Sequence, residues 1–181
     1  MEGYFMKTLL ALVVSAGIVV GLTGMARPET KVEVTKVHIC CGACEKLIGK
    51  TLTDAGVKGT CSKDTKTVSI TADDAKAAQK AIDALAAAGF HGETGNKDLA
   101  MKDDSGAKEG KVASAKVSGI HNCCPNCCKA IKGIVGKVDG VKEEDVKPKE
   151  GSFTVKGDFD AAKLVKALNE AGFHCKVEAG K

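Results

Sequence analysis

The chain has 181 residues, of which 44% are hydrophobic and 28% are charged, and its formal net charge is +4. These values are ordinary for a soluble globular protein. Because aromatic residues make up 3% of the chain and no basic block is present, the composition argues against nucleic-acid binding.

The N-terminal segment has the composition of a leader sequence. Lys7 precedes an uncharged run over residues 8–26, and Gly24-Met25-Ala26 supplies the small residues that a signal peptidase needs. Residues 1–26 are therefore expected to be a signal peptide. An uncleaved membrane anchor is the alternative, because about twenty apolar residues can span a bilayer. Either interpretation predicts an exported protein, periplasmic or extracellular.

The remainder divides into two similar halves. In residues 27–95 the hydrophobic periodicity predicts a strand over 31–37, a helix ending at Gly56, and strands over 57–66 and around 68–70. A second helix is predicted over 74–88, with Thr71 or Asp73 as its N-cap, and a short strand follows from Phe90. The second half, 111–181, repeats this order, with strands over 112–117, 141–146, 153–155 and 173–177 and a second helix over 159–170. The charged, glycine-containing stretch 96–110 is expected to be a flexible linker. The predicted fold class is α+β, with two tandem ferredoxin-like βαββαβ domains.

A repeated cysteine motif marks both halves. His38-Ile39-Cys40-Cys41-Gly42-Ala43-Cys44 corresponds to His121-Asn122-Cys123-Cys124-Pro125-Asn126-Cys127, and the offset is 83 at every matched position. The same offset relates Ala-Gly-Phe-His at 88–91 and at 171–174. The chain is therefore expected to be a tandem duplication whose retained chemistry is a thiol-rich loop.

Each Cys-x-x-Cys pair is predicted to lie where a strand leads into a helix. Backbone N–H groups in the first helical turn have no helical partner and favour negative charge, so thiolates are favoured there. Two thiolates three residues apart can converge on one ion, and soft sulfur ligands favour Cu(I) or Zn(II) over Mg(II) or Ca(II).

In this order of elements and in the position of its Cys-x-x-Cys pairs, the sequence resembles heavy-metal-associated domains. Gly-Val-Lys at 56–58 and 140–142 and Ala-Gly-Phe before the last strand add to the resemblance. These domains form copper chaperones, the N-terminal arms of metal-transporting P-type ATPases, and the periplasmic mercury-binding protein. The resemblance implies metal ligands at Cys41, Cys44, Cys124 and Cys127.

The chain departs from the usual pattern of the family before each first ligand. Where the family has Gly-Met-Thr, this sequence has His38-Ile39-Cys40 or His121-Asn122-Cys123. The additional candidate ligands are Cys40, Cys123, His38 and His121, which raise the supply to four per loop and suit tetrahedral Zn(II) as well as two- or three-coordinate Cu(I). Asn122 is costly to bury, so the second loop is expected to be looser than the first.

Other cysteines and histidines receive weaker predictions. His91 and His174 face either the metal loop or solvent, and Cys128 is expected to lie outward on its helix. Cys61 and Cys175 are unrepeated, and a disulfide between them has support from parity alone.

The function expected from these features is that of an exported, non-enzymatic protein that captures or transfers a thiophilic ion: Cu(I), Zn(II) or Hg(II). The expected partner is a metal transporter or another metal-binding domain, and the membrane is a partner only if the leader is uncleaved. The alternative is a periplasmic thiol–disulfide oxidoreductase that uses the same cysteine pairs. A thioredoxin-like enzyme also needs a cis-proline opposite its cysteines, and neither Pro28 nor Pro148 is well placed for that role.

Overall fold

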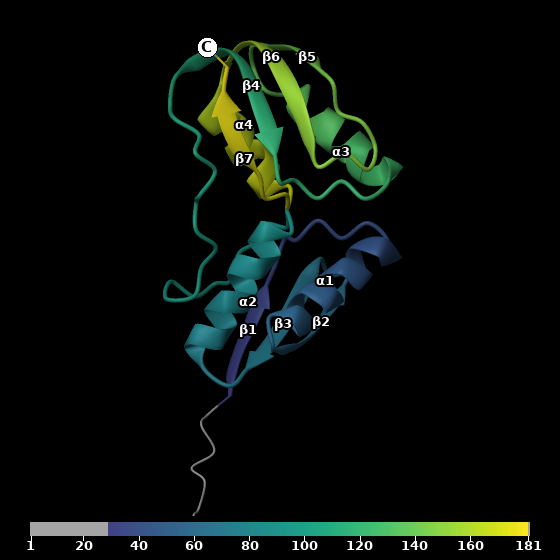
Figure 1. The fold of residues 1–181 in the computed structure, drawn as a ribbon, viewed down its shortest axis with the longest axis vertical. Helices are drawn as coiled ribbons and strands as arrows, with labels where there is room; N and C mark the ends of the chain where they lie inside the picture. Colours follow the sequence, from purple (N-terminus) through teal and green to yellow (C-terminus); the bar gives the residue numbers. More distant parts are fainter. Residues whose placement is uncertain (1–28, 181) are drawn as a thin grey trace, which may run out of the picture.

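The computed structural model describes residues 29–180. The expected leader, residues 1–26, lies outside the described residues. The fold is α+β, as predicted, with two βα units joined by an extended segment (Figure 1). Among residues 29–180, no helix is long and apolar enough to cross a membrane.

The first unit contains an antiparallel sheet covered by two helices. Its elements are β1 (Thr30–Val34), α1 (Gly42–Asp54), β2 (Lys58–Ser62), β3 (Thr67–Ala72) and α2 (Ala75–Ala87). The sheet order is β1-β3-β2, with Val32 opposite Ile70 and Cys61 opposite Val68. Alternate residues of β1 and β3 are buried, as the period of two predicts.

Two local predictions for this unit are wrong. The N-cap of α2 is Asp74, whose side chain accepts a hydrogen bond from the backbone N–H of Ala77, and not Thr71 or Asp73. The expected strand from Phe90 does not form. In its place are two isolated bridges, Thr35 with Glu93 and Phe90 with Phe173. Phe90 does not continue the first sheet because its backbone pairs with the second unit.

The second unit has the complete βαββαβ order. Its elements are β4 (Lys111–Ser118), α3 (Pro125–Val135), β5 (Val141–Glu144), β6 (Ser152–Asp160), α4 (Ala161–Glu170) and β7 (Lys176–Ala179), with sheet order β5-β6-β4-β7. The helix predicted from Phe159 begins later because β6 continues to Asp160. The Asp160 carboxylate accepts hydrogen bonds from the N–H groups of Ala162 and Lys163 and so starts α4.

Aliphatic side chains fill the core of each unit. Ile48 and Leu85 bring α1 and α2 onto the first sheet, and Ile131 and Leu164 bring α3 and α4 onto the second; all four are fully buried. Burial of one such side chain stabilises a fold by roughly 1.5–3 kcal/mol. This packing holds the start of α1 and of α3 in fixed positions.

The segment 96–110 is attached to both units and is not the free linker that its composition predicts. Leu99 and Ser105 are buried, and the Gln79 side chain of α2 donates a hydrogen bond to the carbonyl of Ala100. The Ser105 carbonyl accepts a hydrogen bond from the N–H of Val177 in β7.

The two units meet through the turns that follow α2 and α4. The Gly89 carbonyl accepts hydrogen bonds from the N–H groups of His121 and His174, and the Gly172 carbonyl accepts those of His38 and His91. These reciprocal contacts bring the loops before α1 and α3 to the same side of the molecule, where they face each other (Figure 1).

Candidate metal centre

The two thiol loops have the same local geometry. Cys41 is the N-cap of α1 and Cys124 is the N-cap of α3, both with extended backbone dihedrals. The N–H of Cys44 donates to the carbonyl of Cys41 at 3.0 Å, so the second cysteine of the motif lies in the first turn, as predicted. Pro125 occupies the start of α3, where its missing N–H and fixed φ carry no penalty.

The cysteines of each motif converge. The Sγ atoms of Cys41 and Cys44 are 3.7 Å apart, and those of Cys124 and Cys127 are 3.8 Å apart. The sulfur atoms of each Cys-x-x-Cys pair can therefore contact a common ion.

The loops also share one cluster across the junction between the units. The Sγ of Cys40 lies 3.4 Å from that of Cys127 and 3.6 Å from that of Cys124. In return, the Sγ of Cys123 lies 3.8 Å from that of Cys41 and 3.7 Å from that of Cys44. These inter-unit contacts are as short as those within a loop, so six sulfur atoms form a single group, called here the thiol cluster.

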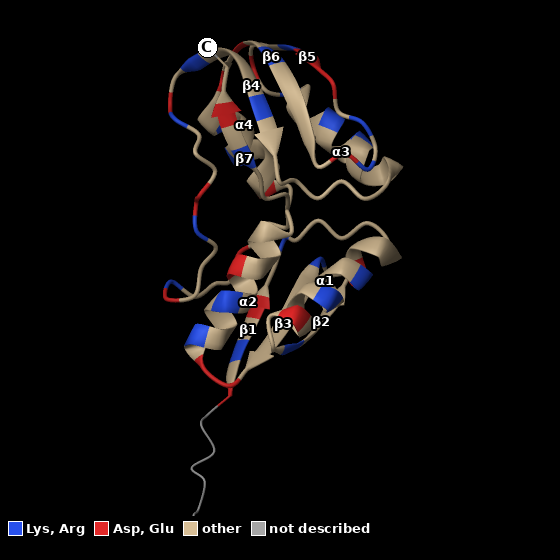
Figure 2. Ribbon diagram, in the orientation of Figure 1, with Lys and Arg blue, Asp and Glu red and all other residues tan. Residues whose placement is uncertain are grey.

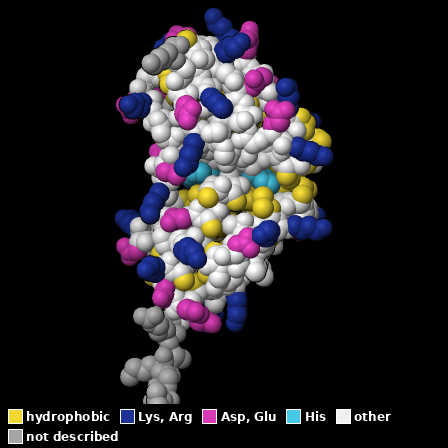
Figure 3. Space-filling model, in the orientation of Figure 1, with side chains coloured by type: hydrophobic (Ala, Val, Ile, Leu, Met, Phe, Trp, Pro, Cys, Tyr) yellow, Lys and Arg dark blue, Asp and Glu magenta, His cyan; other side chains and the backbone are white. Residues whose placement is uncertain are grey.

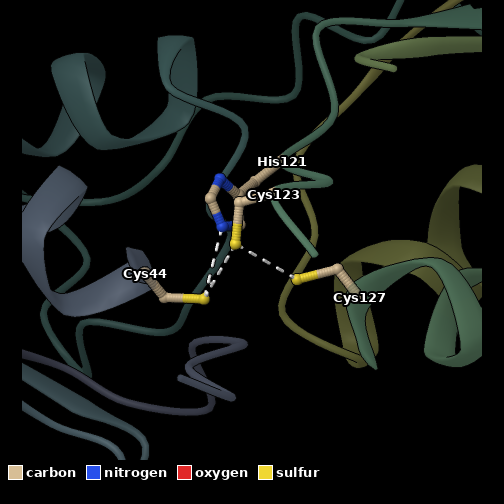
Figure 4. A group of neighbouring side chains, drawn as sticks. All are labelled: Cys44, His121, Cys123 and Cys127. Carbon is tan, nitrogen blue, oxygen red and sulfur yellow. Dashed lines mark hydrogen bonds between the residues drawn. The ribbon is translucent and has the colours of Figure 1, made fainter. Parts of the chain in front are cut away.

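Two histidines border the thiol cluster from opposite sides. The His121 ring stacks on Phe90 of the first unit, with centroids 4.2 Å apart, and its Nε2 lies 3.3 Å from the Sγ of Cys44 (Figure 4). The His38 ring stacks in the same way on Phe173 of the second unit, at 4.1 Å. Among the described residues, His38 Nε2 is buried without a hydrogen-bond partner, a position that a metal ion would satisfy.

The eight candidate ligands from the sequence fall into three overlapping groups. The groups are Cys44, His121, Cys123 and Cys127; His38, Cys40 and Cys127; and Cys40, Cys41 and Cys124. The candidate ligand atoms within each group lie within 4.8 Å of one another, and every group combines residues of both units.

The geometry fits a soft metal ion. Zn–S bonds of 2.3 Å place sulfur atoms about 3.8 Å apart in a tetrahedron and about 4.0 Å apart in a triangle. The sulfur–sulfur separations in the cluster run from 3.4 to 3.9 Å. The sulfur atoms therefore need small adjustments to surround an ion, and the donor set of thiols with imidazole suits Zn(II) or Cu(I).

Burial and hydrogen bonding distribute the protons of the cluster unequally. Interaction with the neighbouring Cys127 thiol, and in addition with His121, lowers the pKa of Cys44, and the same interaction raises the pKa of Cys127. Desolvation raises the pKa of Cys40 and of Cys123. The N–H of Cys127 lowers the pKa of Cys124 to about 7. Further thiolates would thus need a cation to balance their charge.

Apart from one histidine in each, the two loops contain no side chain that can carry a positive charge. Residues 37–44 and 119–128 contain no Lys, Arg, Asp or Glu, and the facing loops are uncoloured by charge in Figure 2. In the space-filling view, histidines lie at the junction between the units, beside side chains of the hydrophobic class, in which cysteine is included (Figure 3). In a sulfur-rich junction without basic side chains of this kind, a bound metal cation would balance the charge of several thiolates.

The second loop is anchored, contrary to the prediction that it is looser. Asn122 is buried, and its side-chain amide donates hydrogen bonds to the carbonyls of Lys147 at 2.7 Å and Glu150 at 3.0 Å. Ile39 is buried at the matching position of the first loop. Each loop is thus fixed from beneath, one by an apolar side chain and the other by a hydrogen-bonded amide.

The remaining cysteines lie outside the cluster. Cys128 is buried with its Sγ directed to the carbonyl of Val146, so the expectation that it lies outward is wrong. Cys61 is a free thiol whose Sγ contacts the carbonyl of Glu45, and Cys175 is a free, buried thiol.

His91 and His174 stack on each other at the other side of the junction. Their ring centroids lie 5.9 Å apart, and the side chain of His174 pairs with Asp104 at 2.8 Å. Neither belongs to the three candidate ligand groups among residues 29–180. They belong to the contact between the units.

The pairing of the two loops is what the sequence did not reveal. The sequence supplies four candidate ligands in each loop but does not tell whether the two loops bind ions separately or share one. One signal was present: the repeated Ala-Gly-Phe-His segments provide the carbonyls of Gly89 and Gly172 that hold the loops of the opposite unit. This repeat was visible in the sequence, but nothing in it indicated which surface it would contact.

Comparisons with known proteins bear on the second unit. Residues 115–174 match the family described as the heavy-metal-associated domain. A solved structure, the solution structure of the N-terminal soluble domains of Bacillus subtilis CopA, is similar with 18% identity and a TM-score of 0.31, over 85% of this chain and 97% of that chain. No curated protein matches the chain.

Proposed function

We propose that this protein captures a thiophilic metal ion and hands it to a partner, using a centre that both thiol loops build together. The observation that supports this most directly is the thiol cluster, in which cysteines of both units approach within 3.4–3.9 Å. The match of residues 115–174 to the heavy-metal-associated domain agrees with this role.

The cluster has the properties that ion transfer requires. Cys40, Cys41, Cys123 and Cys124 are half-buried, whereas Cys44 and Cys127 are fully buried. An incoming thiol can therefore reach the ion from the exposed rim before the inner cysteines release it. A metal transporter or another metal-binding domain with its own cysteines is the partner that this chemistry suits.

The ion belongs to the soft or borderline class: Cu(I) or Zn(II), with Hg(II) as a further member. Thiolate and imidazole donors favour these ions, and the cluster offers no carboxylate. The leader expected at residues 1–26 completes the proposal with export to the periplasm or the cell exterior.

Metal uptake under reducing conditions tests the function. Purified protein is incubated separately with Cu(I), Zn(II) and Hg(II) in the absence of oxygen, and native mass spectrometry measures the bound ions. We expect uptake by the wild-type protein and by Cys61→Ser, which changes a thiol outside the cluster. A wild-type protein that binds none of the three ions would refute the proposed function.

A thiol–disulfide oxidoreductase is the competing activity, because the sulfur atoms already lie in contact. Such an enzyme works with one pair of cysteines, and the histidines and additional cysteines of the cluster would have no part in it. Disulfide exchange with a model substrate after complete metal removal would favour the enzyme. We expect the metal-free protein to be inactive in that assay.

A further inference from the structure

We infer that the thiol cluster holds two ions side by side, each bound by residues of both units, instead of one ion in each loop. This inference rests on the proposed metal-binding function and adds the number of ions and the ligands of each. It predicts that the metal ions hold the two halves of the protein together.

Two of the three candidate groups share no residue, and the third, His38 with Cys40 and Cys127, overlaps both of them. The inner set consists of Cys44, His121, Cys123 and Cys127, and the outer set consists of Cys40, Cys41 and Cys124. Together they use every thiol of the cluster. Each set takes cysteines from both loops, so neither can form within a single unit.

The contacts favour this division over one ion per loop. The Sγ of Cys44 lies 3.3 Å from His121 Nε2 of the other unit, whereas the Sγ of Cys41, in its own loop, is 3.7 Å away. The closest sulfur to Cys40 is that of Cys127 at 3.4 Å, also across the junction. An ion placed between Cys41 and Cys44 would lie beside sulfur atoms of the opposite loop at equal range and would recruit them.

The inner set has the character of a closed four-ligand site. Three of its members, Cys44, His121 and Cys127, are buried, and Cys123 is half-buried. Figure 4 shows the four side chains directed toward a common centre, from both sides of the junction. Three sulfur atoms with one imidazole nitrogen match the tetrahedral coordination typical of structural Zn(II).

The outer set has the character of an exchange site. Its three thiols are all half-buried, and it contains no histidine. Three sulfur atoms suit a three-coordinate soft ion such as Cu(I). The Sγ of Cys40 also contacts those of Cys44 and Cys127, at 3.7 and 3.4 Å, so its sulfur can bridge the two ions. Each thiol that binds releases its proton, and no electron is transferred.

Pairs of Cys→Ser substitutions distinguish the two arrangements because they divide the ligands differently. Cys41→Ser with Cys124→Ser removes two ligands of the outer set, one from each loop. Cys41→Ser with Cys44→Ser removes both Cys-x-x-Cys thiols of the first loop and takes one ligand from each set. Cu(I) is the probe, in the absence of oxygen and with bicinchoninate as competing chelator, and native mass spectrometry counts the ions retained.

We expect two ions in the wild-type protein and in Cys61→Ser, and one ion in Cys41→Ser/Cys124→Ser, whose inner set is intact. In Cys41→Ser/Cys44→Ser the inner set keeps Cys123, Cys127 and His121, so we expect one ion that bicinchoninate removes more easily than from the wild-type protein. One ion per loop would instead leave no ion in Cys41→Ser/Cys124→Ser, because each Cys-x-x-Cys pair has lost a thiol, and an ion held as tightly as in the wild-type protein in Cys41→Ser/Cys44→Ser, whose second loop is intact. Circular dichroism of each variant shows that it is folded.

Several outcomes would overturn the inference: no ion in Cys41→Ser/Cys124→Ser, an ion held at wild-type strength in Cys41→Ser/Cys44→Ser, a single ion in the wild-type protein, or two ions in Cys41→Ser/Cys124→Ser. A wild-type protein that retains no ion would instead refute the proposed function. X-ray absorption by Cys41→Ser/Cys124→Ser loaded with one Zn(II) adds a direct measure of the inner set. Imidazole scattering from His121 is expected, and an environment of sulfur alone would contradict the assignment.

Discussion

At the scale of single residues, the position of a cysteine on its helix decides how readily it loses its proton. Cys124 caps α3, where the N–H of Cys127 stabilises its negative charge and lowers its pKa to about 7. Cys61 lies in the exposed strand β2, and desolvation raises its pKa. Two half-buried thiols of one chain therefore differ in reactivity.

Cys124 should be the first thiol to react in the metal-free, reduced protein. The thiolate is the nucleophile, and Cys44, whose pKa is also lowered, is fully buried and out of reach. Brief treatment with iodoacetamide at pH 7.5, followed by peptide mass spectrometry, measures the order of modification. Faster modification of Cys61 than of Cys124 would contradict the assigned charge distribution, and bound metal should protect Cys124.

A histidine at the other side of the junction makes stability depend on pH. Desolvation by burial lowers the pKa of His91 below the ordinary value of 6.5, with His174 adding to the effect and Glu93 and Asp103 opposing it. Below pH 6.5 the unfolded chain therefore binds more protons than the folded one. The stabilising contribution is complete above pH 6.5 and is lost as pH falls toward the lower pKa of the folded state.

The metal-free protein should accordingly melt at a lower temperature at pH 5.5 than at pH 7.5. His91→Gln removes one of the groups responsible, so its melting temperature should fall less steeply over the same interval. Differential scanning calorimetry of both proteins measures the two slopes. A slope that is equal or steeper in the variant would show that His91 does not contribute.

At the scale of elements, the turn after each second helix serves two purposes. Gly89 follows α2 with φ of +84°, a conformation that glycine adopts at the end of a helix at little cost. A Cβ at Gly89 would lie 2.2 Å from the N of His121 in the other unit. Gly172 has φ of +88°, and a Cβ there would lie 2.2 Å from the N of His38. Both turns end a helix, and because glycine lacks a Cβ they also allow the loop of the opposite unit to make close backbone contact.

Gly89→Ala should therefore force the units apart, and Gly56→Ala is its matched control. Gly56 also has a positive φ, +81°, but a Cβ there meets nothing within 4 Å. We expect Gly56→Ala to cost about 1–2 kcal/mol from the left-handed backbone alone. Gly89→Ala should cost clearly more and should also weaken metal binding. Equal losses of stability with unchanged metal affinity would mean that the contact at Gly89 does not position the loops.

At the scale of the whole molecule, the two units meet as partners in a symmetric dimer do. His38 N–H bonds to the Gly172 carbonyl, and His121 N–H bonds to the Gly89 carbonyl, so the same contact is made twice in opposite directions. Reciprocal use of one surface is the property of a two-fold interface. The connecting segment keeps the halves at high effective concentration, and the ions that we propose would add ligand bonds between them.

Cutting that connection should separate the effect of the metal from that of the chain. A protease site inserted between the exposed residues Lys108 and Glu109 allows cleavage of the folded protein. We expect the two fragments to co-elute in size-exclusion chromatography when Cu(I) is bound, and their association to weaken at least tenfold after chelation. Fragments that part equally readily with and without metal would show that no ion bridges the units.

Much of this architecture could be predicted from residue spacing, because interactions between residues close in sequence determine it. Helix and strand periods located the elements of both units, and the constant offset of 83 revealed the repeat. The eight candidate ligands, which the structure brings into overlapping groups, could be named because they recur in a strand-to-helix loop. Errors occurred where a long-range contact decided the outcome. The backbone of Phe90 pairs with the other unit instead of its own sheet, so the expected strand does not form. The Asn122 side-chain amide donates hydrogen bonds to two carbonyl groups, so the second loop is anchored and not loose.

The sequence by itself determined the two units, the start of α1 and α3 at a cysteine N-cap, and a supply of sulfur ligands of the kind that soft ions favour, since all of these depend on neighbours within a few residues. The tertiary structure alone decided that the loops face each other and merge into one thiol cluster. That outcome depends on the reciprocal docking of Gly89 and Gly172 against loops of the opposite unit. Residues far apart along the chain make this contact, and a local sequence pattern does not predict which surfaces of the two units pack together.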